Sequence, residues 1–202
     1  MQKLLIATNN AGKVIELNSK LTAAGVEAHT LSEFSGIREI EESGTTFVEN
    51  AMLKAAGYAV QTGLLALADD SGLEVRALEG RPGVLSARYG GTSLSFATRI
   101  ELLLSELSGM NDAERLARFN CAMAIAGPSG TILFVSQGIC GGRISRGPRG
   151  SGGFGYDPIF VPDGFDQTFG ELQQTIKQEI SHRARALEPI IPFLRRFYRG
   201  LT

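Results

Sequence analysis

The stretch Leu65-Ala66-Leu67-Ala68-Asp69-Asp70-Ser71-Gly72 decides how the rest of the chain is arranged. Its first four residues form an apolar run that is too short for a helix, which predicts a buried strand. Asp69 and Asp70 follow at the carboxyl end of that strand, where open α/β sheets bind their ligands. Because consecutive strand residues point to opposite faces, we expect one aspartate to act in a site and the other to hold the turn.

Gly72 is expected to let the chain bend sharply before a second strand over residues 73–78. The alternative is that the stretch has only a structural role. In that case the two carboxylates accept hydrogen bonds from local N–H groups in an Asx-turn that closes a hairpin. Taken alone, the stretch favours this alternative, so the remaining motifs decide between the two.

Composition and charge narrow the class of protein. The 202 residues are 43% hydrophobic, which suits one α/β domain, or one domain of two lobes, with a core of its own. The formal net charge is −1, so no overall field attracts nucleic acid or an anionic membrane. Cys121 and Cys140 lie in separate apolar segments without a C-x-x-C spacing, which argues against a zinc site.

No segment predicts export or insertion into a membrane. Near the amino terminus only residues 4–7 are continuously apolar, which is too short for the core of a signal peptide. No other apolar run approaches the length of a transmembrane helix. We therefore expect a cytoplasmic protein that binds neither nucleic acid nor membrane.

The first candidate site is the turn Thr8-Asn9-Asn10-Ala11-Gly12-Lys13. It follows a buried strand over residues 3–8 and precedes a helical pattern that stops at Gly25. Such a turn presents backbone N–H groups at the positive end of a helix, which is an anion site. A lysine opposes the helix dipole there, and a bound phosphate would resolve that conflict. The alternative is an ordinary asparagine N-cap with a solvated lysine.

The segment that follows is acidic and then helical. Residues 26–31 alternate as a second strand, and residues 32–43 form an acidic, irregular stretch that has the composition of a solvated loop. Thr46-Phe47-Val48-Glu49 matches a capping box, which predicts that a helix begins there. Lys54 on this helix is either an exposed charge or a ligand-binding cation.

The second half of the chain predicts a helix over residues 94–107 and a hairpin of residues 117–126 with residues 131–139. Residues 141–147 are expected to add a third strand to this ribbon. The glycine-rich segment from Arg149 to Pro158 is expected to approach a ligand closely, with Phe154 stacked on a flat ring. The alternative is a mobile turn with Tyr156 packed inward. A last helix is expected to begin at Ser181.

The residue types together indicate one kind of chemistry. Cationic and acidic side chains in these motifs suggest a polyphosphate with a divalent metal such as Mg²⁺ between them. A flat group and a His-Arg pair would bind a base, so hydrolysis of a nucleoside triphosphate fits the set. A Ser-His-Asp site is not indicated, because His29 and His182 are the chain's two histidines. The candidates are Lys13, Lys54, Lys177 and Arg183, then Glu41, Asp69 and Asp70, and finally Phe154 and His182.

Six motifs, in one order along nearly the whole chain, carry a family resemblance. They are Thr8-Asn-Asn-Ala-Gly-Lys13, Thr46-Phe-Val-Glu-Asn-Ala51 with Lys54, Ala68-Asp-Asp-Ser-Gly-Leu73, Gly80-Arg-Pro-Gly83 with Ser86-Ala-Arg-Tyr89, Gly152-Gly-Phe-Gly-Tyr-Asp-Pro158, and Ile180-Ser-His-Arg183. Together they resemble the inosine/xanthosine triphosphate pyrophosphatase family. The resemblance implies an elongated mixed α/β fold, a single domain over residues 1–202 with two lobes, a nucleotide in the central cleft, and a homodimer.

The resemblance also implies a role for each matched residue. Asp70 would be the general base and a Mg²⁺ ligand, and Glu41, with Glu42 as the other possible register, would be the second metal carboxylate. The remaining matched residues would bind substrate: Thr8, Asn9, Asn10, Ala11, Gly12, Lys13 and Lys54 at the phosphates, Ser71, then Phe154, Gly155, Tyr156 and Asp157 at base and sugar, and Lys177, His182 and Arg183 at the base edge.

The reaction implied by the resemblance is hydrolysis of ITP, dITP or XTP to the monophosphate and pyrophosphate. Two alternatives stay open at this point. One is a related pyrophosphatase that acts on pyrimidine or modified nucleotides. The other is a nucleotide-binding module without turnover. The sequence does not indicate how guanine, which shares the 6-oxygen, is excluded.

Overall fold

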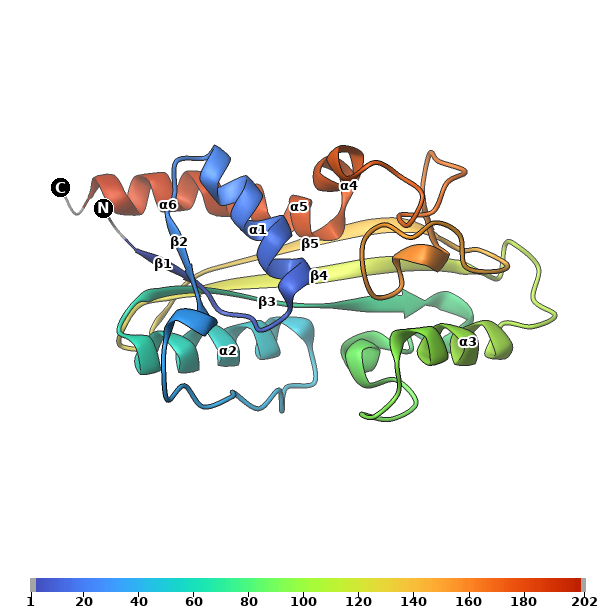
Figure 1. Ribbon diagram of the computed structural model, residues 1–202, viewed down its shortest axis with the longest axis horizontal. Coiled ribbons are helices and arrows are strands. Elements are labelled where there is room, and N and C mark those ends of the chain that lie inside the picture. The colour runs from blue at the N-terminus through green and yellow to red at the C-terminus, as the bar shows by residue number, and fades with distance from the viewer. Residues whose placement is uncertain (1–2, 201–202) are drawn as a thin grey trace. The chain divides into compact units, whose positions relative to one another are not determined.

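The computed structural model describes residues 3–200, which form an α/β fold around one mixed six-stranded sheet (Figure 1). The strands lie in the order β2-β1-β3-β4-β5-β6. β1 is parallel to β2 and β3, whereas β5 and β6 are antiparallel. The strands are β1 (Leu4–Ile6), β2 (Ala28–Thr30), β3 (Leu65–Val75), β4 (Leu116–Ala126), β5 (Ile132–Ile144) and β6 (Phe160–Pro162). The α/β class expected from the sequence is confirmed.

The helices flank the sheet, and short 3₁₀ turns connect several elements. The helices are α1 (Ala11–Ala23), α2 (Phe47–Thr62), α3 (Phe96–Glu106), α4 (Gln174–Ile180), α5 (His182–Leu187) and α6 (Ile190–Arg199). Within residues 3–200, no helix is long and apolar enough to cross a membrane.

The chain divides into two compact units. The first unit comprises Met1–Asp70, Cys121–Gly138 and Arg185–Thr202, and the second comprises Ser71–Asn120 and Ile139–Ala184. The boundary on β3 therefore falls between two consecutive residues of the deciding stretch, Asp70 and Ser71.

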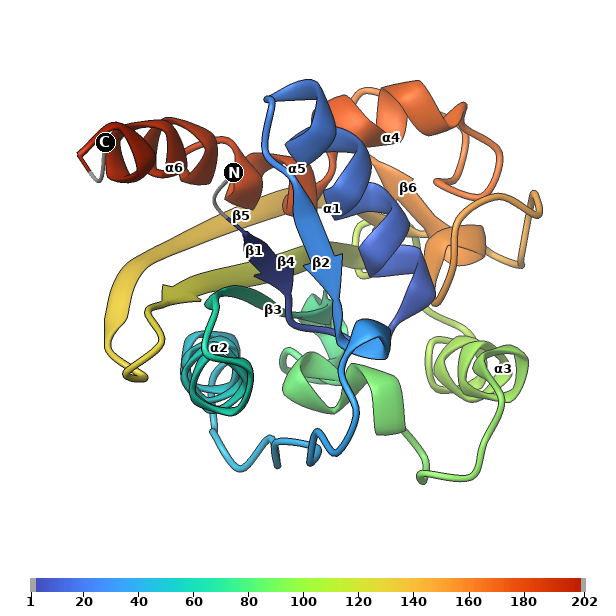
Figure 2. The same cartoon turned by 60° about the vertical axis from the view of Figure 1, so that its left-hand side comes forward.

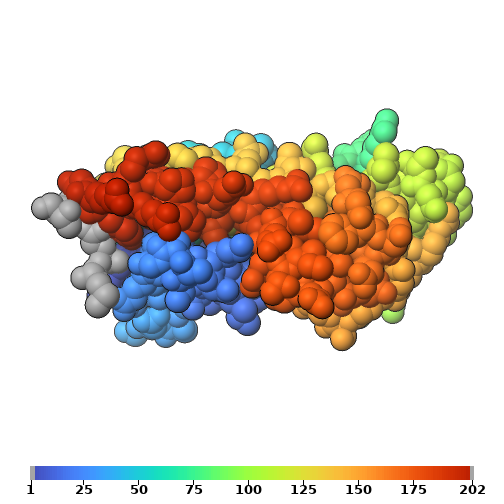
Figure 3. Space-filling model, turned by 90° about the horizontal axis from the view of Figure 1, so that it is seen from above, coloured from blue at the N-terminus to red at the C-terminus, as the bar shows by residue number. Residues whose placement is uncertain are grey.

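The first unit has its own core, formed by its strands with α1 and the last two helices. Leu4, Leu17, Leu67, Met123 and Leu194 are among its buried side chains. Helices α1 and α6 cover one face of its strands and α2 covers the other (Figures 1 and 2). In the space-filling view α6 lies beside the α1 segment on the shared face (Figure 3). Helices α1 and α2 lie on opposite faces of β3, so their side chains can reach both sides of that strand.

The second unit has a separate, more aromatic core. Leu73, Leu103, Phe119, Phe160 and Phe169 are among its buried side chains. The rings of Phe119 and Phe160 lie 4.6 Å apart, and those of Phe160 and Phe169 lie 5.3 Å apart. Phe119 comes from β4 and Phe160 from β6, so the rings join strands of the same unit.

The deciding stretch forms no turn. The prediction of two strands separated by a bend at Gly72 is wrong, because β3 runs without interruption from Leu65 to Val75 and ends in a 3₁₀ turn over Arg76–Leu78. The strand lies between β1 and β4 in the sheet. The backbone stays extended through the aspartates, which also removes the Asx-turn alternative.

The expected hairpin is confirmed as two neighbouring strands, β4 and β5, joined by a turn in which the Gly127 N–H donates to the Thr131 carbonyl at 2.9 Å. The expected third strand over 141–147 is wrong, because β5 itself continues to Ile144. The last helix is also divided: α5 ends at Leu187 and α6 begins at Ile190, with Pro189 between them.

Candidate active site

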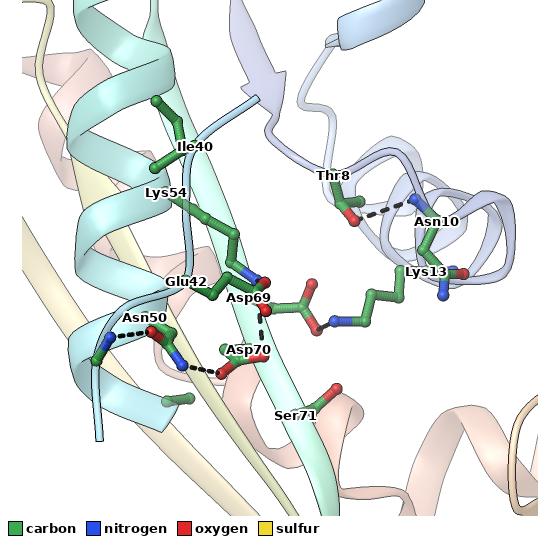
Figure 4. A network of polar contacts seen from close by, with 12 residues as sticks. Thr8, Asn10, Lys13, Ile40, Glu42, Asn50, Lys54, Asp69, Asp70 and Ser71 are labelled. Carbon is green, nitrogen blue, oxygen red and sulfur yellow. Dashed lines mark hydrogen bonds and ion pairs between the residues drawn. The ribbon is translucent and has the colours of Figure 1, made fainter. Parts of the chain in front are cut away.

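Two adjacent carboxylates on β3 form the centre of a cluster in the first unit (Figure 4). Asp69 is fully buried and Asp70 is 5% exposed. The Asp69 Oδ2 atom lies 3.0 Å from Lys13 Nζ, and the Asp70 Oδ1 atom lies 3.6 Å from Lys54 Nζ. The two carboxylates thus face different helices, as the alternation of a strand requires. Buried carboxylates are expensive unless a cation is close, and each has one.

The loop before α1 combines an N-cap with a charged side chain. The Asn10 Oδ1 atom accepts a hydrogen bond from the Lys13 N–H at 3.2 Å, and the Asn10 N–H donates to Thr8 Oγ1 at 3.2 Å. The predicted asparagine cap is confirmed. The lysine is not solvated, because its ammonium is paired with Asp69. The Lys13 ammonium and the positive end of the α1 dipole would both favour an anion at this position.

Helix α2 begins at the predicted capping box. The Glu49 N–H donates to Thr46 Oγ1, and Glu49 Oε2 accepts from the Thr46 N–H, both at 3.1 Å. One residue further, Asn50 is fully buried and its Oδ1 atom accepts from the Gly44 N–H at 2.8 Å. A Cβ on Gly44 would lie 2.7 Å from that oxygen, so only glycine lets the acidic loop approach the helix this closely.

Asn50 links this loop to the catalytic candidate, because its Nδ2 atom donates to Asp70 Oδ2 at 3.0 Å. Lys54, one helical turn later on α2, lies between two carboxylates, with Glu42 Oε1 at 2.5 Å and Asp70 Oδ1 at 3.6 Å. Glu42 and Asp70 therefore converge on one cation. Glu41, the residue named for the metal, is exposed, and the structure brings its neighbour Glu42 to the cluster instead.

The carboxylates available for a metal are few. Among the described residues there is no group of three or more His, Cys, Asp or Glu side chains placed to hold an ion. Glu42 and Asp70 supply two, and Mg²⁺ characteristically takes one or two protein carboxylates and completes its shell with water and phosphate oxygens. The donor set thus fits Mg²⁺ bound together with a phosphorylated substrate.

Burial and neighbouring charges set the ionisation of the cluster. Burial, reinforced by the Glu42 carboxylate, raises the pKa of Asp70, although Lys54, Lys13 and the Asn50 amide oppose this. For Lys54, burial lowers the pKa, but Asp70, Asp69 and Glu42 together raise it above the ordinary value. Lys54 therefore stays protonated, while Asp70 has the raised pKa of a carboxyl group suited to proton transfer.

A second cluster, in the second unit, is built around Asp157. Its Oδ2 atom accepts from the Phe154 N–H at 2.7 Å and from Lys177 Nζ at 2.6 Å. A Cβ on Gly153, whose φ is +71°, would lie 2.0 Å from the same oxygen. The glycine-rich segment is therefore a tight, carboxylate-centred loop.

The rings and cations of this cluster face one another. Lys177 is only 2% exposed, and its Nζ atom lies 4.7 Å from the centre of the Phe154 ring. The Arg183 guanidinium lies 5.5 Å from the same ring, and its Nη2 atom donates to Ser71 Oγ at 2.9 Å. Phe154 thus lies close to two cations, as cation–π contacts favour.

Tyr156 and His182 are buried beside this cluster. The Tyr156 hydroxyl donates to the Ser86 carbonyl at 3.0 Å, and burial raises the pKa of that phenol, so it stays a donor. This matches the alternative in which Tyr156 packs inward. The His182 ring stacks on Phe119, with centroids 4.6 Å apart and planes 14° apart. The predicted base-binding residues thus all lie in the second unit: Ser71, Phe154, Gly155, Tyr156, Asp157, Lys177, His182 and Arg183.

Two contributing residues, Asn50 and Phe119, have no role assigned from the sequence, and Glu42 is named there only as the alternative to Glu41. Asn50 precedes Lys54 by one helical turn, and this spacing could have placed both on one face of α2. Phe119 lies in an apolar strand pattern and carries no signal beyond burial.

The mixed six-stranded sheet with flanking helices places this chain in the α/β class of its solved neighbours. The chain belongs to the Ham1 family, whose model matches residues 4–193. This confirms the resemblance drawn from the motifs.

The similar proteins match nearly end to end. A dITP/XTP pyrophosphatase of Desulforamulus reducens is 48% identical over 97% of each chain, and one of Exiguobacterium is 47% identical over 96% of this chain and 99% of its own. The structure of a HAM1 protein from Coxiella burnetii superimposes with a TM-score of 0.87 at 41% identity, covering 97% of this chain and 100% of its own. A dITP/XTP pyrophosphatase structure from Mycobacterium abscessus gives 0.75 at 43%, over 96% and 100%.

The raised pKa of Asp70 predicts a stability effect. Because the pKa of Asp70 is raised above that of an ordinary aspartate, the folded chain holds this proton more tightly than the unfolded chain does, so stability falls as pH rises through the folded pKa. Asp70→Asn cannot ionise. We expect it to resist urea better than the wild type at pH 7 in a chelator, with the difference shrinking toward pH 4. Asp112→Asn, an exposed control, should change little. Lower stability of Asp70→Asn at pH 7 would contradict the account.

Proposed function

We propose that this protein hydrolyses deaminated purine nucleoside triphosphates, namely ITP, dITP and XTP, to the monophosphate and pyrophosphate. By this reaction it would remove them from the pool that supplies DNA and RNA synthesis, and we place that activity in the cytoplasm. The observation that carries the proposal is the buried Lys54 ammonium between Asp70 and Glu42, beside the Lys13–Asp69 pair. The names of the relatives, dITP/XTP pyrophosphatase, supply the substrate class.

In this proposal the triphosphate binds at the first cluster. The backbone and side chains of Thr8, Asn9, Asn10, Ala11, Gly12 and Lys13 bind phosphate oxygens at the start of α1, where the helix dipole and Lys13 both favour an anion. Lys54 neutralises charge that builds on the departing phosphates. Asp69 keeps the Lys13 ammonium in place, since the pair is separated by 3.0 Å and is nearly closed to solvent.

Glu42 and Asp70 are the proposed Mg²⁺ ligands. The bound ion would supply charge neutralisation on the phosphates and lower the pKa of water. Asp70 accepts the proton of the attacking water, and the Asn50 amide fixes the orientation of its carboxylate through the 3.0 Å hydrogen bond. The new bond forms between that water oxygen and the α-phosphorus. The bond from the α-phosphorus to its bridging oxygen breaks, and pyrophosphate leaves.

The base is proposed to bind at the second cluster. Phe154 offers a flat ring, held by Gly155 and by the hydrogen bonds of Asp157, while Tyr156 anchors the loop. Lys177, His182 and Arg183 are hydrogen-bond donors, and Ser71 lies beside Arg183. Hypoxanthine and xanthine carry an acceptor oxygen at position 6, whereas adenine carries an amino group. Donors left unpaired by adenine give a large energetic penalty, which is the proposed basis of selectivity.

The test of this function is pyrophosphate release from inosine, xanthosine, guanosine, adenosine and pyrimidine triphosphates, with and without Mg²⁺. We expect Mg²⁺-dependent release from the inosine and xanthosine nucleotides, with the others at least tenfold slower, since about 1.4 kcal/mol of differential binding suffices for that factor. Activity mainly on pyrimidine nucleotides would overturn the base-binding assignment. Binding without any release would favour the non-catalytic alternative.

A matched pair of variants tests the metal assignment. Glu42→Gln removes a carboxylate that contacts Lys54, and we expect it to lower kcat by 10²-fold or more and to raise the Mg²⁺ concentration needed for half-maximal rate. Glu41→Gln changes the exposed neighbour and should stay within about threefold of the wild type. A large loss of kcat in Glu41→Gln with little loss in Glu42→Gln would show that Glu41, and not Glu42, is the second metal ligand.

We also propose a homodimer, formed in part through an exposed apolar strip of the first unit. On β5, Phe134 stacks on Phe193 of α6, and the Ser136 hydroxyl donates to the Ala186 carbonyl. Leu133 and Val135 alternate with them and point to the opposite face, where they are 37% and 36% exposed. Val60 of α2 is 58% exposed and close to the β4–β5 turn at Gly130. A second copy would bury this strip.

Charge placed on the strip should break the dimer. We expect the wild type to sediment as a dimer and Val135→Asp to sediment as a folded monomer, because a carboxylate cannot be buried in an apolar interface without a partner. Ile15→Asp on α1, which is more exposed and lies elsewhere, is the control and should remain dimeric. A monomeric wild type, or a dimeric Val135→Asp, would count against this interface.

A further inference from the structure

The His182 imidazole lies on an aromatic platform that belongs to none of the six motifs. Its ring is stacked on the Phe119 ring of β4, with 4.6 Å between the centroids and an angle of 14° between the ring planes. Both residues are almost fully buried, at 4% exposed for His182 and 7% for Phe119. A stacked contact of this kind fixes the plane of the imidazole, and the plane determines where its ring N–H can point.

Phe119 is itself held rigidly. Its ring lies 4.6 Å from Phe160 at an angle of 57° and 6.2 Å from Phe169 at 25°. The platform of Phe119, Phe160 and Phe169 joins β4, β6 and the loop before α4, all within the second unit. Phe169 also lies 5.7 Å from Lys177 Nζ. Close packing of three rings leaves Phe119 little freedom to tilt, and therefore leaves His182 little freedom as well.

We propose that Phe119 is a positioning residue for base selection: by stacking on His182 it holds the imidazole at a fixed angle to the 6-position of a bound purine. This rests on the proposed function, in which His182 reads the base edge. A hydrogen bond weakens steeply as its angle departs from linear, so a fixed donor rewards the 6-oxo group and penalises the 6-amino group. An imidazole that can rotate away from the base would discriminate less between the 6-oxo and the 6-amino group.

Phe119→Leu tests the proposal, because leucine fills much of the space but offers no ring. We expect the ratio of kcat/KM for ITP over ATP to fall about tenfold, mainly through a higher KM for ITP, while kcat for ITP changes little. The phosphate-binding residues and Asp70 are untouched. Phe160→Leu is the matched control, because it alters the same platform but keeps both the Phe119 ring that stacks on His182 and the Phe169 ring that packs on Phe119. Its ITP/ATP ratio should stay within twofold of the wild type.

A spectroscopic readout separates positioning from general loosening. The chain has two histidines, so the NMR signals of the two imidazoles are few, and His29 serves as an internal reference. A phenyl ring stacked on His182 shifts the imidazole protons upfield by its ring current. We expect this shift to disappear in Phe119→Leu and to persist in Phe160→Leu, with His29 unchanged in both. If Phe119→Leu does not fold, Phe119→Met, of similar volume and also without a ring, replaces it.

The outcomes distinguish this proposal from the function on which it rests. A selective wild type and an equally selective, folded Phe119→Leu variant would overturn the role of Phe119 alone. Unchanged His182 shifts in that variant would do the same. Loss of selectivity in Phe160→Leu equal to that in Phe119→Leu would assign the effect to the platform's stability and so overturn it too. A wild type that does not discriminate ITP from ATP would instead overturn the proposed function.

Discussion

The burial of two consecutive carboxylates on a central strand is the constraint on which the first unit depends. Each buried charge costs several kcal/mol unless a cation lies close. Asp69 and Asp70 point to opposite faces of β3, so each forms its direct ion pair with a different lysine. Helices α1 and α2 cover these two faces and bring Lys13 and Lys54 to them. The same requirement explains why the α2 capping box and the Gly44–Asn50 contact are so tight: they hold the loop that brings Glu42 to Lys54.

The second unit also buries a charged pair, but glycines and aromatic rings surround it there. Lys177 is buried beside Asp157, which also caps the loop through the Phe154 N–H, and Phe154 lies near both Lys177 and Arg183. Here the glycines are required by contact, because a Cβ on Gly153 would collide with the Asp157 carboxylate. One unit thus gathers groups that suit phosphates and a divalent metal, and the other gathers flat and donor groups that suit a base. A nucleoside triphosphate has both chemical parts.

Much of this could be predicted from the sequence, because local patterns dictate it. The helix beginning at the Thr46 capping box, the Asn10 cap and the β4–β5 hairpin depend on neighbours in the chain. The motifs also identified the family. What the sequence does not settle depends on neighbours that are distant along the chain. The bend at Gly72 is absent because β3 continues through this residue as a strand of the sheet, which no local signal reveals. Glu42 rather than Glu41 meets Lys54 because of the loop's path, and the stacking of Phe119 on His182 joins residues far apart in sequence.

The central claim is that the two adjacent aspartates do different work, Asp70 in proton transfer and metal binding, Asp69 in holding Lys13 for the phosphates. The most direct measurement is steady-state hydrolysis of ITP by Asp70→Asn and Asp69→Asn, with nucleotide binding measured separately for each. The account predicts that Asp70→Asn loses kcat by 10³-fold or more yet still binds nucleotide, whereas Asp69→Asn mainly raises KM. Near-normal turnover in Asp70→Asn, or the same pattern of loss in both variants, would contradict it.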